Sequence, residues 1–188
     1  MISLKTGRLL LRNFTEDDLF AFCELLNDKE ASPQAAFDRP YPVSRGEQSA
    51  LLSFLCERDD YLAICLPPSP RPVGFVSLAG AEGGHGPELG YFVRSQNLGQ
   101  GIAREACAAM LDYAFGQMRL SLVFSNAAAE NEGLCALLKS LGFCENGPAE
   151  PIWLRLDQAS GQPRWFTAQS YVLRSEDWPP ADGSALPF

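Results

Sequence analysis

Two glycines just before a predicted helix mark the part of the sequence with the clearest potential for chemistry. The segment RSQNLGQGIAREACAAML, residues 94–111, brings Gln96, Gly99 and Gly101 together between a strand-like run and an amphipathic helix. Glycine weakens a helix, so two of them here indicate a tight turn or a close approach of the backbone to another group. A strand that leads through such a turn into a helix directs backbone N–H groups and the positive end of the helix dipole at one place. That place would attract an anion such as phosphate.

Two known nucleotide-binding motifs do not fit this turn. A dinucleotide-binding fingerprint needs a third glycine where Arg104 stands, and a P-loop needs Gly-Lys and then Ser or Thr where the chain has Gly-Ile-Ala. A glycine turn with a purely structural use stays an alternative, because short glycine motifs often match by chance.

The elements that must position this turn follow from hydrophobic spacing and from capping residues. Thr15 and Ser44 are predicted to cap the first two helices, and Gly142 is predicted to end the last one. Helices are predicted over residues 15–28, 44–59, 101–114 and 131–141. Strands are predicted over residues 7–14, 60–66, 73–80, 87–94, 120–127, 151–157 and 164–174, and residues 31–43 are predicted to be a loop.

The order of these elements predicts the fold class. A strand-helix-strand crossover at the centre, with antiparallel hairpins around it, indicates a mixed α/β protein in which helices cover a mixed sheet. A chain of 188 residues favours one domain, which we assign to residues 1–178, with 179–188 as a loose tail.

Composition limits the classes of partner and site. With 23 acidic and 15 basic residues the formal net charge is -8, which argues against a nucleic-acid partner. An acidic surface favours cationic substrates such as amines, although it also serves solubility alone. The chain has neither a signal peptide nor an apolar run that could cross a membrane, so we expect a cytoplasmic protein. Six scattered cysteines without a C-x-x-C pair and a single histidine, His85, predict no metal site.

The glycine turn also resembles a family motif. QNLGQG, residues 96–101, fits the Q/R-x-x-G-x-G/A motif of the GNAT N-acetyltransferase superfamily, whose loop and helix N-terminus hold the pyrophosphate of acetyl-coenzyme A. PELGYFV, residues 87–93, looks like the family's splayed fourth strand, and ENEGLCALLKSLGF, residues 130–143, resembles its second cofactor segment. The resemblance implies a GNAT fold: a central mixed, mostly antiparallel sheet with splayed central parallel strands, flanked by helices.

Both ends of the chain resemble one branch of that family. TGRLLLRNFTEDDL, residues 6–19, and SYVLRSEDW, residues 170–178, are similar to segments of the ribosomal-protein N-acetyltransferase (RimJ/RimL-like) branch. The resemblance therefore covers nearly the whole chain, to about Trp178.

Site residues carried over by position concern the cofactor first. Phe92 and Val93 would bond the pantetheine arm in the manner of an added strand. Asn131 would reach the cofactor near the pantetheine, although an ordinary helix N-cap is the alternative role. The resemblance implies that the pyrophosphate of acetyl-coenzyme A is held by backbone groups of Leu98, Gly99, Gln100, Gly101, Ile102 and Ala103.

The chain departs from the family where a proton donor for the thiol is expected. A serine three residues after the asparagine, or a tyrosine seven residues after it, is replaced by Leu134 and Leu138. Both leucines fall on the apolar face of their helix, so a place in the core is the better interpretation. Another group or water must then protonate the thiolate, or catalysis is weak, or the protein binds coenzyme A without using it.

Candidate catalytic residues come from the chemistry of amide formation, which needs a base or a water chain to remove a proton from the amine. Glu88, on the strand before the turn, is the first candidate for the base; a solvated carboxylate at a strand edge is the alternative. Tyr171 could donate a proton or only pack, and His85 could be a base, a substrate contact or merely solvated. Cys107 and Cys135 lie in helices without a partner base, which argues against a covalent acyl-enzyme.

The sequence thus predicts an N-acetyltransferase that moves an acetyl group from acetyl-coenzyme A to a primary amine by direct attack in a ternary complex. The branch makes a protein N-terminal amine the leading acceptor and a small-molecule amine the second. Phe37 and Tyr41 fall where the family's acceptor site is shaped. A non-catalytic acyl-coenzyme A binding or sensing protein and a non-enzymatic α/β interaction module stay open, as does the oligomeric state.

Overall fold

The computed structural model describes residues 1–80, 86–157 and 160–179. In that part of the chain the strands are β1 (Ser3–Lys5), β2 (Leu10–Asn13), β3 (Tyr61–Cys65), β4 (Pro72–Gly80), β5 (Pro87–Val93), β6 (Leu122–Ala128), β7 (Cys144–Glu145), β8 (Glu150–Leu156) and β9 (Pro163–Arg174). The α-helices are α1 (Leu19–Ala31), α2 (Arg45–Cys56), α3 (Ile102–Gly116) and α4 (Glu132–Ser140). Short 3₁₀ turns are η1 (Glu16–Asp18), η2 (Pro33–Phe37), η3 (Ser95–Asn97) and η4 (Ser175–Asp177).

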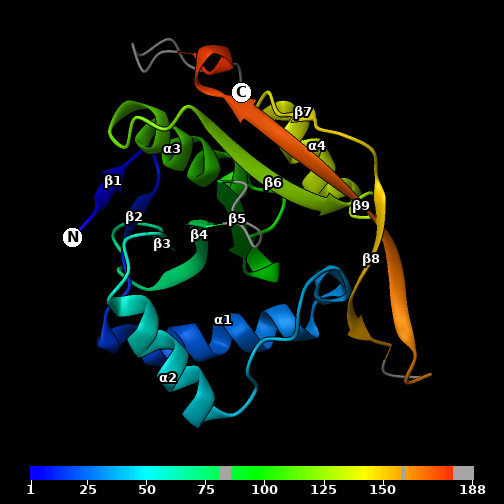
Figure 1. Cartoon of the computed structure of the whole chain (residues 1–188). Coiled ribbons are helices and arrows are strands. Elements are labelled where there is room, and N and C mark those ends of the chain that lie inside the picture. The colour runs from blue at the N-terminus through cyan, green and yellow to red at the C-terminus, as the bar shows by residue number, and fades with distance from the viewer. Residues whose placement is uncertain (81–85, 158–159, 180–188) are drawn as a thin grey trace.

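The strands form one sheet with helices on both faces (Figure 1). The strand order is β1-β2-β3-β4-β5-β6-β9-β7, and β8 pairs with β9 beside this path. Helices α1 and α2 lie on one face and α3 and α4 on the other, while β8 and the first part of β9 extend past the end of α1 (Figure 1). The predicted fold class, a mixed α/β sheet flanked by helices, is confirmed.

The two strands at the centre of the sheet, β5 and β6, are paired over only a short length. Strands β5 and β6 are parallel and share a single registered pair, Glu88 with Phe124, whereas β4 and β5 are paired over their full length. The crossover between them runs through α3, as parallel neighbours require. Beyond Glu88 the two strands therefore separate toward their carboxyl ends, and β5 has an open edge there.

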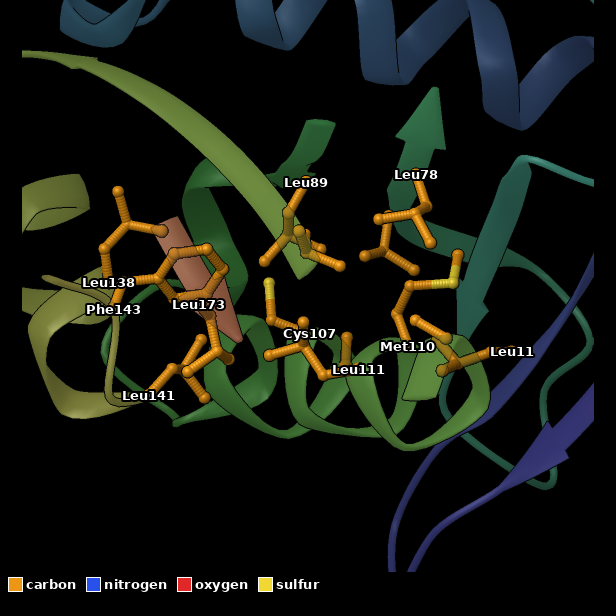
Figure 2. Packing of buried hydrophobic residues seen from close by; sticks show 14 of the residues in the cluster. Leu11, Leu78, Leu89, Cys107, Met110, Leu111, Leu138, Leu141, Phe143 and Leu173 are labelled. Atoms are coloured by element: carbon orange, nitrogen blue, oxygen red, sulfur yellow. The ribbon is translucent and has the colours of Figure 1, made fainter. Parts of the chain in front are cut away.

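Two hydrophobic clusters hold the helices on the sheet. The larger one packs α3 and α4 onto the sheet through side chains such as Met110, Leu111, Leu138 and Leu173, all at most 1% exposed (Figure 2). The smaller one lies below α1 and α2 and includes Phe22, Leu25, Phe75 and Phe92. Since burial of one such side chain is worth roughly 1.5–3 kcal/mol, both helix layers are firmly fixed to the sheet.

The capping predictions are confirmed for Ser44 and Gly142 and are wrong for α1. Thr15 precedes the short η1 turn, where its N–H donates to the Asp18 carboxylate at 2.9 Å, and Asp18 is the residue that precedes α1. The Ser44 hydroxyl caps α2 by accepting from the Glu47 N–H, and Gly142, with a φ of 88°, follows the end of α4.

Some elements differ from the prediction at the ends of the sheet and in the proline-rich loop. The single strand predicted over 7–14 is a hairpin instead, with β1 before it and β2 confined to Leu10–Asn13. A turn of 3₁₀ helix, η2, lies within the predicted loop because Pro33 suits the first turn of a helix. The two-residue strand β7 was not predicted, since so short a run has no pattern. His85 and most of the predicted tail, residues 180–188, lie outside the described residues.

Candidate functional site

The glycine turn opens directly into α3 and leaves backbone donors without helical partners. Gly99 and Gly101 have φ angles of 73° and 75°, a left-handed conformation that glycine adopts without strain. The first hydrogen bond of α3 runs from the Glu105 N–H to the Gly101 carbonyl at 3.1 Å. The N–H groups of Ile102 and Ala103 therefore have no intrahelical partner, and an anion fits at the start of this 15-residue helix.

The hairpin between β1 and β2 fastens the far end of this turn. Arg8 donates from Nη1 to the Gln100 carbonyl at 3.1 Å and from Nε to Glu105 Oε2 at 2.8 Å. Thr6 Oγ1 donates to the other carboxylate oxygen of Glu105. Burial works to raise the pKa of Glu105, but the hydrogen bonds from Thr6 and Arg8 outweigh it and hold the pKa below its ordinary value. A cation is thus fixed beside the predicted phosphate position.

Acidic side chains of α1 hold the residues that precede the glycine turn. Arg94 Nη2 pairs with Glu24 at 2.9 Å, and the Ser95 N–H donates to Asp28 Oδ2 at 2.7 Å. The turn is consequently held from both sides by side chains of other elements.

The open edge of β5 connects this turn to the centre of the sheet. Phe92 and Val93 are 7% and 3% exposed, so their side chains are buried on the two faces while their backbone lies at the splayed edge. An extended pantetheine arm can pair with such an edge as an added strand does.

Glu88 lies at the point where β5 and β6 part. Its Oε1 accepts hydrogen bonds from the Asn126 backbone N–H at 3.2 Å and from Asn126 Nδ2 at 2.9 Å. At the same junction of β5 and β6, Ser125 Oγ donates to the Leu89 carbonyl at 3.0 Å. Asn126 and Ser125 were not identified from the sequence, because their contacts depend on the register between two strands that are 36 or more residues apart.

Tyr171 lies on the opposite face of the sheet from Glu88. Glu88 shares the face of Phe92, four residues along β5, toward α1 and α2. Tyr171 is 2% exposed in the cluster below α3 and α4. Burial and a contact with the Cys135 thiol raise the pKa of Tyr171 to about 12, so this phenol stays protonated at neutral pH. The structure does not bring the two predicted catalytic residues together.

The second predicted cofactor segment has the contacts of a helix start. Asn131 Oδ1 accepts from the Leu134 N–H at 3.3 Å, so this residue caps α4. Leu138 is 1% exposed in the core and the half-buried Leu134 packs against it, as predicted for both. Cys107 is fully buried, which raises the pKa of its thiol, and Cys135 Sγ lies 3.5 Å from the Ala128 carbonyl.

The predicted acceptor segment is joined to the hairpin of β8 and β9. The Phe37 ring lies 5.0 Å from that of Phe166, and Arg155 pairs with Glu30 at 3.0 Å. Lys29 pairs with Asp38 at 2.6 Å and lies 5.0 Å above the Tyr41 ring. Segments distant in sequence therefore contact one another here, and Lys29 links them to β5 because its Nζ also lies 5.4 Å from the centre of the Phe92 ring.

The described part of the chain contains neither a metal-ligating cluster nor a membrane-spanning helix. Within residues 1–80, 86–157 and 160–179 there is no cluster of three or more metal-ligating side chains. No helix in the same ranges is long and apolar enough to cross a membrane.

Comparison with known sequences identifies the family. The profile of the acetyltransferase (GNAT) domain matches residues 8–144. YdaF of Bacillus subtilis (strain 168), provisionally named a ribosomal N-acetyltransferase, is 37% identical over 62 residues. That match covers 33% of this chain and 34% of YdaF, so the aligned part spans about a third of the relative.

Solved structures share the whole fold. The ribosomal-protein-S5-alanine acetyltransferase from Vibrio fischeri aligns with a TM-score of 0.74 at 18% identity, over 96% of this chain and 100% of that one. RimJ of Mycobacterium smegmatis, solved in complex with CoA-disulfide, aligns with a TM-score of 0.73 at 19% identity, over 95% and 88%. The predicted family and the predicted class of enzyme, acyltransferase, are confirmed by the family profile, and the solved structures confirm the fold; the names of these relatives agree with the predicted resemblance to the RimJ/RimL-like branch. Since that profile spans well over half of its residues, the chain belongs to the GNAT acetyltransferase family.

Proposed function

We propose that this protein transfers the acetyl group of acetyl-coenzyme A to a primary amine by direct attack in a ternary complex. The observation that carries the proposal is the continuous path from the anion-binding start of α3, along the open edge of β5, to Glu88 at the strand junction. A phosphate-bearing molecule with a long extended arm fits such a path.

The residues of the glycine turn have the binding role in this proposal. Backbone groups from Leu98 to Ala103 hold the pyrophosphate, Phe92 and Val93 hold the pantetheine arm, and Asn131 contacts the arm from the start of α4. Acetyl-coenzyme A supplies an activated thioester. As the new C–N bond forms, the C–S bond breaks and the leaving thiolate must take up a proton.

Glu88 is the proposed base. It removes the proton of the attacking amine through a water molecule, and Asn126 holds its carboxylate in place with two hydrogen bonds. Tyr171 is the proposed donor on the thiol side. Its phenol is protonated and lies on the face of α4, where Leu134 and Leu138 have no proton to give.

A protein N-terminal amine is the first proposed acceptor and a small-molecule amine the second. The names of YdaF and of the Vibrio fischeri enzyme, both referring to ribosomal proteins, support the first choice. They also support the cytoplasm as the proposed location.

The test is calorimetric titration with acetyl-coenzyme A, followed in the same sample by thiol release with a panel of amines and peptides. Binding with release supports the proposal. Binding without release would assign the protein to the second candidate, an acyl-coenzyme A sensor, which the leucines at positions 134 and 138 favour. Absence of binding would contradict both.

The Glu88→Gln variant tests the base. We expect kcat to fall by about a hundredfold or more with the affinity for acetyl-coenzyme A unchanged, since a positioned base typically contributes 10²–10⁴ in rate. Glu176→Gln, at an exposed carboxylate of η4, is the matched control. An unaltered pH–rate profile in Glu88→Gln would remove Glu88 from the mechanism.

A further inference from the structure

An apolar cavity of about 260 Å³ lies between the sheet and the helices α1 and α2. Phe75, Ala79 and Gly80 of β4 form its sheet side, and Leu51, Phe54 and Leu55 of α2 form its helix side. Phe22, Tyr41, Arg58 and Tyr61 complete the lining. The proposed path of acetyl-coenzyme A runs along the other edge of β5, so cofactor binding does not explain this cavity.

The cavity begins one strand away from the proposed base. Ala79 is directly opposite Glu88 in the ladder between β4 and β5, and Phe75 is directly opposite Phe92. Residues directly opposite in an antiparallel pair have Cβ atoms roughly 4.5–5.5 Å apart and project on the same face. An amine placed near Glu88 therefore has the cavity within reach of its own substituent.

The described lining is rich in aromatic side chains, and its phenols are uncharged. The rings of Tyr41 and Tyr61 lie 6.4 Å and 6.3 Å from the Phe75 ring. Burial raises the pKa of both phenols, so they stay uncharged. Among the described lining residues Arg58 is the charged one; its guanidinium pairs with Asp60 and lies 5.1 Å from the Phe54 ring.

We propose that this cavity binds a bulky apolar group, of the size of an aromatic ring, carried next to the acceptor amine. This inference rests on the proposed transfer to an amine and names its substrate class. The source is either the first side chain of a peptide, such as Phe or Leu, or an arylalkyl amine. An apolar cavity of roughly 150 Å³ already holds benzene, so the volume suffices for a ring with its linker. A charged first side chain would lose its hydration without gaining a free counter-ion.

The experiment compares acceptors that differ in this group alone. Peptides identical except for Phe, Ala or Asp at the first position form one arm, and 2-phenylethylamine with ethylamine forms the other. We expect kcat/KM for the bulky member to exceed that of the small one by about tenfold or more, the discrimination that a few apolar groups give in a pocket. The two arms together show whether the source is a peptide or a small amine.

Variants that change the volume tie the preference to the cavity. Ala79→Leu fills it beside Glu88 and should remove most of the preference while leaving acetyl-coenzyme A affinity unchanged. Phe54→Ala, at a side chain that is 54% exposed and so of little weight for folding, opens it and should weaken the preference for a single ring. Ala136→Leu, at an exposed position of α4, is the matched control.

Failure of this inference differs from failure of the proposed function. Turnover with equal kcat/KM for bulky, small and acidic acceptors would overturn the cavity assignment and leave the acetyltransferase standing. Calorimetric binding of 2-phenylethylamine that Ala79→Leu weakens, without acetyl transfer, would support the cavity and contradict the proposed function. If the bulky acceptors are neither bound nor acetylated, the inference is overturned.

Discussion

The two halves of the site are built by different means. The proposed cofactor half is a backbone structure: one turn of six residues, two left-handed glycines and the start of α3. The proposed acceptor half is a side-chain structure, assembled from α1, the segment after it, α2 and the strands β3 and β4. A backbone site must be continuous in sequence and leaves a motif, whereas a side-chain site can be gathered from anywhere. This difference explains why the sequence indicated the first half and not the cavity.

The largest effect expected on ligand binding tests whether the cofactor half depends on backbone conformation. Gly101→Val places a β-branched residue at a φ of 75°, with a Cβ 3.4 Å from Arg8 Nη2. Strain of this kind costs of order 1–3 kcal/mol, and its relief redirects the N–H groups of the turn. We expect the Kd for acetyl-coenzyme A to rise about thirtyfold, measured by calorimetry.

The control for this prediction is Gly147→Val, which carries similar strain elsewhere. Gly147 has a φ of 79°, and nothing lies within 4 Å of a Cβ built on it. It should lose stability without losing affinity for the cofactor. Equal affinities in Gly101→Val and the unaltered protein would show that the turn does not hold the pyrophosphate.

The next effect tests the acceptor half through its buried cation. The Lys29 side chain is 7% exposed and pairs with Asp38, which is 41% exposed. Lys29→Met keeps the apolar stem but frees Asp38, which water can then hydrate, so we expect a loss of about 1–2 kcal/mol in the free energy of unfolding. Because Lys29 also lies above the Tyr41 ring, the acceptor KM should rise several-fold while cofactor affinity stays the same.

A matched exposed pair separates burial from charge loss. Lys139→Met removes a pair with Glu145 whose side chains are 60% and 55% exposed, and urea unfolding should detect almost no change. If Lys29→Met weakened acetyl-coenzyme A binding as much as acceptor binding, the division of the site into two halves would be wrong.

A smaller effect is expected for the cation of the cofactor half. Arg8 is 53% exposed, so Arg8→Ala should hardly alter stability. Because it holds Gln100 and Glu105 beside the proposed phosphate position, we expect about a fivefold rise in the Kd for acetyl-coenzyme A, and a weaker dependence of that Kd on salt. Lys139→Ala, 60% exposed and paired with Glu145, is the control. An unchanged salt dependence would show that Arg8 fixes the turn and does not face the phosphate.

Most of the fold could be predicted from local patterns. A capping residue, Ser44, located the start of α2, and the spacing of Ile102, Ala106 and Met110 located α3. The misses were elements that depend on their partners: β1 exists because it pairs with β2, and β7 because it pairs with β9. Neither has enough residues to show an alternation of its own.

The site could be predicted only as far as its parts are contiguous. The turn around Gly101 was indicated by its own residues, but Arg8 reaches it from more than 90 positions away. The link between Glu88 and Asn126 likewise depends on a single registered pair of strands. Hydrophobic spacing carries no information about such register, so these contacts required the structure.

The smallest expected effect is a dependence of stability on acid. Burial works to raise the pKa of the Glu30 carboxyl, but hydrogen bonds from Arg155 and from the Tyr41 N–H outweigh it and hold the pKa below its ordinary value of 4.5. A carboxyl whose pKa is lower in the folded state than in the unfolded state stabilises the folded protein at a pH above the unfolded-state pKa. This contribution is lost as the pH falls through the folded-state pKa. We therefore expect the free energy of unfolding to decrease below about pH 4.5, and Glu30→Gln to flatten this part of the curve.

Protonation of Glu30 should also loosen the hairpin of β8 and β9, which Arg155 ties to α1, so acceptor KM should rise on acidification before cofactor affinity falls. Protonation of Glu105 should have the opposite result, a fall in cofactor affinity before acceptor KM rises, because Glu105 has a lowered pKa and lies in the cofactor half. Acceptor KM and the Kd for acetyl-coenzyme A, measured for Glu30→Gln and Glu105→Gln at pH 4 and pH 7, thus assign acid sensitivity to one half or the other, and equal changes of both quantities in both variants would contradict the division into two halves.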